Sequence, residues 1–263
     1  MEHLEGRQSV YAALMARQRK FQVLLLKQGM HEDKIAQILE VATAQNIPMK
    51  YVDGKELDGI THGSTHGGVV AICSPKPRMD ARQLLMFARE ISGKPLMLLL
   101  EGVDDARNLG FTLRSADAMG VHCVLIKKHL WDFDPVEVSR PSSGAFERLA
   151  IAQIDDVEPI KELQKMGMQL IGCIAGVKRK IYDIDMKKPT ILAIGGEKRG
   201  LSGAVRSICD RLAMIPTVGP DASSLSLSHA SGIVMAEAMR QRHFGMAVQE
   251  EILVDESGVD TVS

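Results

Sequence analysis

Five short apolar runs, each followed by polar or glycine-rich residues, constrain the fold of this chain most strongly. They are continuous rather than alternating, and they lie at Leu96–Leu100, Val121–Ile126, Leu170–Ile174, Ile191–Ile194 and Leu212–Ile215. Continuous apolar strands are typical of a parallel sheet that is covered on both faces. Helical spacing of apolar residues predicts helices at Leu109–Met119, Val157–Met166 and Ser231–Arg242. This alternation predicts an α/β domain with a mainly parallel sheet.

In residues 1–74, helical and strand-like stretches alternate, which predicts a separate, smaller α/β domain. Helical spacing occurs at Val10, Leu14 and Met15 and at Ile35, Ile38, Leu39 and Ala42, and strand-like runs occur at Val23–Leu26, Ile47–Val52 and Val69–Ile72. Ser74-Pro-Lys-Pro77 predicts a linker over 75–95, with a short helix in it, because proline favours extended backbone. The larger domain is then expected at 96–245, followed by an acidic, disordered tail at 246–263.

Composition excludes several classes of function. No run approaches the roughly 20 apolar residues of a membrane span, and the N-terminus lacks the basic and apolar regions of a secretory signal. The four cysteines are widely spaced and form no CxxC pair, which predicts reduced thiols in a cytoplasmic protein and no metal site. A net charge of −1 gives no sign of a nucleic-acid binder, and 4% aromatic residues argue against a base-stacking RNA surface.

The first segment that could carry chemistry follows Leu96–Leu100 and opens a helix. Asp105 is a candidate N-cap, and Asn108 and Gly110 suit a tight entry from loop to helix. Arg114 lies on the polar face of this helix, where a guanidinium could orient or deprotonate a hydroxyl or bind a phosphate. Taken alone, a capped helix with an exposed arginine explains the segment equally well.

Two further segments follow the ends of later strands. Gly195-Gly-Glu-Lys-Arg-Gly200 allows close backbone approach to a ligand, but it is neither a Rossmann nor a Walker motif. Ile215-Pro216 precedes the serine-rich stretch Ser223–Ser228, whose hydroxyl and N–H groups could bind an anion or carboxylate at a helix start. A nucleophilic pairing of these serines with His229 is disfavoured, because no GxSxG motif is present. Since parallel strands present their carboxyl ends at one edge, all three segments are expected to meet there.

Together, the three segments resemble the motifs of the SpoU (TrmH-like) family of RNA 2′-O-ribose methyltransferases. Asn108 and Arg114 match the first motif, Gly195, Glu197 and Gly200 match the second, and Ser224-Leu-Ser-Leu-Ser228 after Ile215-Pro216 matches the third. The N-terminal domain, which ends in His66-Gly-Gly-Val-Val-Ala71, is more loosely similar to the L30-like RNA-binding domain of the larger members. Those members include the 23S rRNA guanosine-2′-O-methyltransferases.

The resemblance implies an S-adenosylmethionine-dependent enzyme with a C-terminal trefoil knot. It implies that Arg114 activates the ribose 2′-hydroxyl, with Asn108, Glu197 and Ser224 supporting it. It also implies that the cofactor is held by Gly195, Gly196, Gly200, Ile215, Leu225 and Ser226. The implied partners are structured RNA, with rRNA favoured over tRNA, and a second copy of the chain bound through the knotted domain.

Two residues depart from the family motifs. The family's Asn in the third motif is Ser226 here, and a hydroxyl offers one donor and a shorter reach than an amide. The family's Asp-Pro near the first motif is Asp105-Ala106 here. Ser226 leaves a second hypothesis open, a knotted RNA-binding protein with impaired or lost methyl transfer. A nucleotide-binding α/β enzyme unrelated to RNA is a third.

Overall fold

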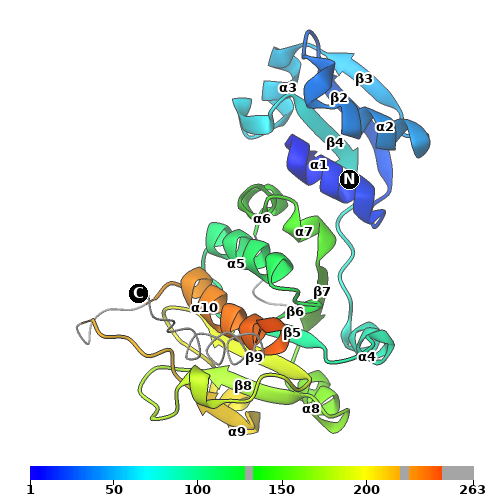
Figure 1. Cartoon of the computed structure of the whole chain (residues 1–263). Coiled ribbons are helices and arrows are strands. Elements are labelled where there is room, and N and C mark those ends of the chain that lie inside the picture. The colour runs from blue at the N-terminus through cyan, green and yellow to red at the C-terminus, as the bar shows by residue number, and fades with distance from the viewer. Residues whose placement is uncertain (128–132, 220–224, 245–263) are drawn as a thin grey trace, which may run out of the picture.

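The computed structural model describes residues 1–127, 133–219 and 225–244, and it contains two units (Figure 1). The strands of the smaller, N-terminal unit are β1 (Glu2–Glu5), β2 (Phe21–Lys27), β3 (Met49–Val52) and β4 (Val69–Cys73), and its helices are α1 (Arg7–Ala16), α2 (Ala36–Ala44) and α3 (Gly54–Ile60). The strand order is β1-β4-β2-β3. β3 runs parallel to β2, and the other pairs are antiparallel.

The core of the smaller unit explains which of its elements the sequence could predict. α1 and α2 bury Leu14 and Ile38 against Leu24 of the sheet, so both helices and the central strands show clear apolar patterns. β1 and α3 were not predicted. β1 is a four-residue edge strand with charged residues, and α3 buries only Leu57.

The larger unit is built on a six-stranded sheet. Its strands are β5 (Leu96–Glu101), β6 (Cys123–Lys127), β7 (Ala150–Ile154), β8 (Gln169–Cys173), β9 (Thr190–Gly195) and β10 (Arg211–Ala213). Their order is β10-β8-β9-β5-β6-β7, and every pair is parallel. The predicted parallel α/β sheet is therefore confirmed, whereas the edge strand β7 was missed.

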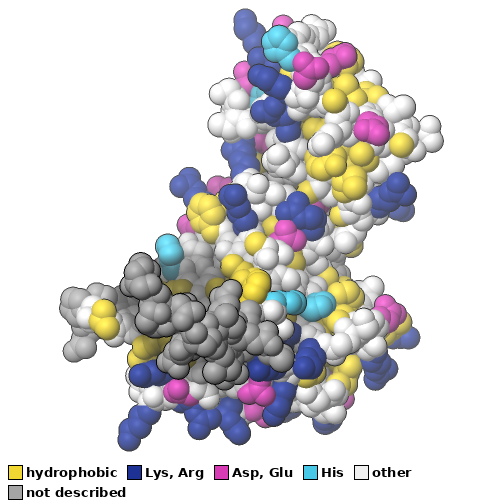
Figure 2. Space-filling view, in the orientation of Figure 1, with side chains coloured by type: hydrophobic (Ala, Val, Ile, Leu, Met, Phe, Trp, Pro, Cys, Tyr) yellow, Lys and Arg dark blue, Asp and Glu magenta, His cyan; other side chains and the backbone are white. Residues whose placement is uncertain are grey.

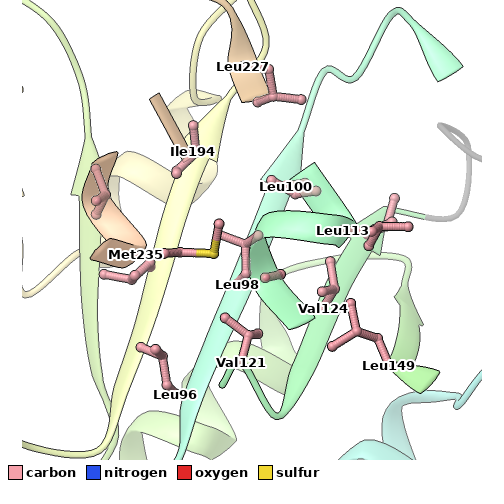
Figure 3. Close-up of a cluster of buried hydrophobic side chains, with 14 of the residues drawn as sticks. Leu96, Leu98, Leu100, Leu113, Val121, Val124, Leu149, Ile194, Leu227 and Met235 are labelled. Atoms are coloured by element: carbon pink, nitrogen blue, oxygen red, sulfur yellow. The ribbon is translucent and has the colours of Figure 1, made fainter. Parts of the chain in front are cut away.

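Helices cover both faces of this sheet. They are α4 (Ala81–Glu90), α5 (Ala106–Ala118), α6 (Pro135–Ser142), α7 (Ala145–Arg148), α8 (Glu158–Lys165), α9 (Gly203–Ile208) and α10 (Leu227–Met239). Leu98 and Leu100 point towards α5 and α10, where they pack with Leu113 and Met235 (Figure 3). Met97 and Leu99 belong to the cluster on the opposite face. This burial on both faces explains why the strands read as continuous apolar runs.

Two helices begin earlier than their apolar spacing predicted, because a polar side chain caps each of them. Asp105 Oδ1 accepts a hydrogen bond from Asn108 N at 2.7 Å, so α5 begins at Ala106. Ser226 caps α10, which begins at Leu227 rather than Ser231. The prediction for Gly110 was wrong. It lies within α5, where a Cβ would come 2.4 Å from Pro141 Cγ, so this glycine allows α6 to pack closely against α5.

A buried ion pair joins the two units. The Arg19 side chain is 1% exposed, and its Nε and Nη2 donate to the two carboxylate oxygens of Glu147 in α7 at 2.8 Å each. Its Nη1 donates to Glu2 at 2.8 Å. An unpaired charge at this position would be strongly destabilising, so this pair holds the smaller unit against α7 in one arrangement. The boundaries expected for the two domains and the linker stay predictions, and the tail at 246–263 lies outside the described residues.

Among the described residues, no helix combines the length and apolar character needed to cross a bilayer. That part of the chain also contains no group of three or more His, Cys, Asp or Glu side chains arranged to hold a metal ion. The four cysteines are free.

Candidate active site

The three predicted segments converge at the carboxyl ends of β5 and β9. α5 begins just after β5, the Gly195–Gly200 loop follows β9, and α10 begins beside both. A hydrogen-bonded network joins them. Asn108 Nδ2 donates to Glu197 Oε1 at 3.2 Å, Ser228 Oγ donates to Asn108 Oδ1 at 3.1 Å, and Leu227 N donates to Glu197 Oε1 at 3.2 Å. Segments up to 120 residues apart in the chain therefore form one cluster.

Each glycine of the second segment meets a separate steric or conformational demand. A Cβ on Gly195 would lie 2.0 Å from the carbonyl carbon of Gly200, and one on Gly196 would lie 1.7 Å from the carbonyl oxygen of Gly102. Gly200 has a φ of 60°, in the left-handed region that favours glycine. Gly200 N donates to Gly196 O at 2.8 Å and closes the loop. The result is a tight turn that presents backbone N–H and C=O groups at the strand end.

The third segment is described only in part, because Ser224 lies outside the described residues. Ile215 follows β10 and is partly buried against the core, and Leu225 is 38% exposed. Ser226 caps α10 by accepting from His229 N at 3.4 Å, and its Oγ lies 3.0 Å from Ser228 Oγ.

Ser226 and His229 do make a side-chain contact, with the serine Oγ 2.6 Å from Nδ1 of the histidine. These residues are three positions apart at the start of one helix, so the contact is part of the local cap. Within the described residues, no carboxylate accepts from Nε2 of this exposed histidine. The geometry thus lacks the third group that orients the base in a catalytic triad, and it does not favour the nucleophile hypothesis.

Arg114 is not part of the Asn108–Glu197 network. It lies six residues beyond Asn108, which is roughly 9 Å along the helix axis, and on a different side of α5. Its side chain is exposed, and it makes no hydrogen bond or ion pair with another described residue. Arg107, Phe111 and Arg114 form an exposed stripe at helical spacing, with Phe111 48% exposed. The guanidinium is therefore free to contact a substrate.

Sequence reasoning missed one polar residue next to the loop. Glu101 is the last residue of β5, only 4% exposed, and its carboxylate accepts hydrogen bonds from Ser202. An acidic residue directly after an apolar strand was a signal that could have identified it, since a buried carboxylate needs partners.

Comparisons with known proteins match both units of the chain. The model of the SpoU rRNA Methylase family matches residues 95–236. A second model, for RNA 2′-O ribose methyltransferase substrate binding, matches residues 3–79. The 23S rRNA (guanosine-2′-O-)-methyltransferase RlmB of Pseudomonas aeruginosa is 33% identical over 242 residues, which are 92% of this chain and 97% of the relative. RlmB of Xylella fastidiosa is 34% identical over 220 residues, covering 83% of this chain and 88% of the relative.

Solved structures show the same architecture. The SpoU methyltransferase AviRb from Streptomyces viridochromogenes, in complex with the cofactor AdoMet, aligns with a TM-score of 0.76 at 25% identity and covers 91% of this chain and 90% of that chain. An AdoMet-bound rRNA methyltransferase from Sinorhizobium meliloti aligns with a TM-score of 0.74 at 26% identity, covering 90% and 86% of the two chains. With a family model over more than half of its length and relatives above 30% identity along nearly all of it, the chain belongs to the SpoU rRNA methylase family.

Proposed function

We propose that this chain transfers a methyl group from S-adenosylmethionine to a ribose 2′-hydroxyl of ribosomal RNA. The observation that carries the proposal is the Asn108–Glu197–Ser228 network, which assembles the three family motifs at one edge of the sheet. Relatives named as 23S rRNA guanosine-2′-O-methyltransferases support rRNA over tRNA as the substrate. We also propose the trefoil knot of the family for residues 96–245.

The Gly195–Gly200 loop, called the glycine loop below, suits the binding of the cofactor. Gly195, Gly196 and Gly200 let the backbone make a tight turn at the end of β9, and a ligand can rest against the backbone of that turn. Ile215, Leu225 and Ser226 supply the remaining predicted contacts from the third segment. When bound, S-adenosylmethionine supplies an electrophilic methyl group. These residues hold and orient it beside the start of α5, and alignment of this kind accounts for much of the rate gain in bimolecular transfers.

We assign Arg114 to the methyl acceptor, which is the ribose 2′-hydroxyl. A guanidinium holds its protons tightly and is a poor base, so the Arg114 side chain is better suited to stabilising the negative charge that develops on the 2′-oxygen, as its proton passes to solvent, and to holding a neighbouring phosphate. Asn108 and Glu197 fix the start of α5 relative to the loop and so position Arg114. Ser224 stays a predicted member of this group.

The activity can be tested directly. Purified protein is incubated with methyl-labelled S-adenosylmethionine and with unmodified bulk rRNA or tRNA. Label in alkali-resistant dinucleotides of rRNA is the expected result, because a 2′-O-methyl group protects the adjacent phosphodiester from alkaline hydrolysis. An absence of label despite measurable binding of cofactor and RNA would exclude the enzyme hypothesis in favour of an RNA-binding protein.

A cleft between the two units supports binding of the RNA backbone. It measures about 550 Å³, and Arg7, Lys34 and Arg140 are among the residues that line it. Glu5 also lines it and pairs with Arg140 and His62. Arg7 and Lys34 form no ion pair among the described residues, so they are the cationic side chains available to a phosphate. Lys and Arg side chains also gather along one edge of the smaller unit, at the left in Figure 2. Cationic groups in a groove suit phosphate contacts, which position RNA without reading its sequence. An rRNA substrate and free cysteines fit the predicted cytoplasmic location.

We propose a homodimer through α5 and α10. α10 carries apolar residues around its whole circumference, a pattern typical of a helix that is buried on all sides. One side packs into the core through Val234 and Met235, whereas Ile233 on another side is only partly buried. The exposed Phe111 of α5 adds apolar surface to this region. A second copy of the chain would cover both.

Substitution of Phe111 by glutamate tests this assembly. We expect at least a tenfold weaker dimer, because a carboxylate would lose its hydration in the interface without gaining a partner. Sedimentation velocity over a concentration series measures the change. Met86→Glu is the matched control, since Met86 is 50% exposed on α4 of the larger unit. If the Phe111→Glu and Met86→Glu proteins dimerise equally well, the interface does not include Phe111.

Ser226→Asn distinguishes an active methyltransferase from an RNA-binding protein that has lost methyl transfer. Asparagine caps helices as well as serine does, so the α10 start and the thermal stability should be retained. We expect methyl transfer to be preserved or raised a fewfold, because the amide restores a second hydrogen-bonding arm. Initial rates at saturating cofactor are the measurement. A clear loss of rate with an unchanged melting temperature would mean that the site is organised around the serine hydroxyl.

A further inference from the structure

We propose that Glu101 is a positioning residue that fixes both ends of the Gly195–Leu201 loop and thereby sets the affinity for S-adenosylmethionine. The inference rests on the proposed function, since it assigns the loop to the cofactor. Among the described residues, the Glu101 side chain bonds to Ser202 and Lys127 and makes no hydrogen bond or ion pair with Arg114, Asn108 or Glu197, so it would act only through the loop.

The main chain of Glu101 fixes the beginning of the loop. Glu101 is the register partner of Gly195 in the parallel pair of β5 and β9. One residue further on, Gly196 N donates to Glu101 O at 2.6 Å. Gly196 also packs so tightly on Gly102 that no side chain fits between them. The loop therefore leaves the sheet in a direction that β5 determines.

The carboxylate of Glu101 fixes the end of the same loop. Its Oε2 accepts from Ser202 N at 2.8 Å, and its Oε1 accepts from Ser202 Oγ at 3.0 Å. Ser202 is the N-cap of α9, where its Oγ accepts from Val205 N at 3.3 Å. The carboxylate thus anchors the helix start that terminates the loop.

The position requires a carboxylate rather than an amide. Three donors converge on it, because Lys127 at the end of β6 forms an ion pair with Oε1 in addition to the two bonds from Ser202. The Glu101 and Lys127 side chains are only 5% and 14% exposed. A glutamine would turn an N–H₂ group, which is a donor only, towards at least one of these donors. A buried donor left without an acceptor is costly, so the loop end should shift.

Glu101→Gln is the experiment, with calorimetric titration of S-adenosylmethionine and steady-state kinetics as the readouts. We expect the dissociation constant and KM for the cofactor to rise about 10- to 100-fold, while RNA affinity stays within about threefold. Because the same loop carries Glu197, kcat at saturation should fall as well, but by less than about tenfold. Glu237→Gln is the matched control. Glu237 is also buried, at 6% exposed, and pairs with Arg240 near the far end of α10.

Two further measurements keep the outcome unambiguous. Lys127→Met removes the ion pair and leaves both Ser202 bonds intact, so its cofactor affinity should fall between those of wild type and Glu101→Gln. Hydrogen exchange should show faster exchange of the 196–202 amides in Glu101→Gln, with the rest of the sheet unchanged, whether or not cofactor is present. The inference would be overturned if Glu101→Gln left both the amide exchange and the cofactor affinity unchanged. It would also be overturned if this variant lost thermal stability and RNA affinity as strongly as it lost cofactor affinity. Failure of the wild-type protein to bind S-adenosylmethionine would instead overturn the proposed function.

Discussion

Arg114→Ala is expected to lower the rate of methyl transfer about 10²- to 10³-fold, the usual loss when one donor to a developing oxyanion is removed. Affinity for S-adenosylmethionine should stay within about threefold, because Arg114 makes no contact with the glycine loop or with the network that supports it. The fold should also be retained, since the side chain is exposed on α5 and has no partner among the described residues. The effect should therefore appear in kcat rather than in the cofactor KM.

Three variants make the Arg114 experiment specific. Arg89→Ala on α4 is the control, because Arg89 is likewise an exposed helical arginine, and its removal should leave the rate unchanged. Arg114→Lys keeps the charge but loses the planar fork of donors, so partial activity would indicate that charge alone contributes. Parallel loss of transfer and cofactor binding in Arg114→Ala would show a structural role instead.

The elements that could be predicted are those whose signal is local. Burial on both faces makes β5 and β9 continuous apolar runs, so their existence and parallel arrangement followed from the sequence. The convergence of the three segments followed from the geometry of parallel sheets. Even so, the apolar pattern placed the starts of α5 and α10 three and four residues too late, because Asp105 and Ser226 decide those starts through single hydrogen bonds.

The contacts that could not be predicted join residues far apart in the chain. Gly110 looks like a turn glycine by sequence, and only the packing of α6 on α5 reveals why a side chain is excluded there. The pairing of Arg19 with Glu147 spans 128 residues, and nothing near either residue indicates the other. The same holds for Glu101 and Ser202, which are 101 residues apart.

These distant contacts form a continuous path from the smaller unit to the acceptor residue. Arg19 fixes the smaller unit to Glu147 in α7, and α6 and α7 both pack against α5. α5 carries Asn108 at its start and Arg114 on its exposed side. RNA held by the smaller unit would therefore meet Arg114 at a fixed separation, which suits an enzyme that must select one ribose in a large structured substrate.

Gly196→Ala is expected to have the largest effect on cofactor binding. The added Cβ would lie 1.7 Å from the carbonyl oxygen of Gly102. That oxygen belongs to the backbone, and a Cβ is held rigidly by its own Cα, so neither atom can move without displacing a strand end. The loop must shift, and the hydrogen bond from Gly196 N to Glu101 O at 2.6 Å must lengthen or break. We expect cofactor affinity to fall at least about 100-fold, together with a loss of about 1–3 kcal/mol in the free energy of unfolding, as for other overpacked sites.

Gly203→Ala is the matched control, because a Cβ at Gly203 would meet no atom within 4 Å and the residue opens α9. Alanine is favoured over glycine in helices by up to about 1 kcal/mol, so this variant should be as stable as wild type or slightly more so, with unchanged cofactor binding. Calorimetric titration and denaturant unfolding of both variants give the two quantities. Near-normal cofactor binding in Gly196→Ala would mean that the ligand does not rest on this loop, since no side chain can be added there without moving it.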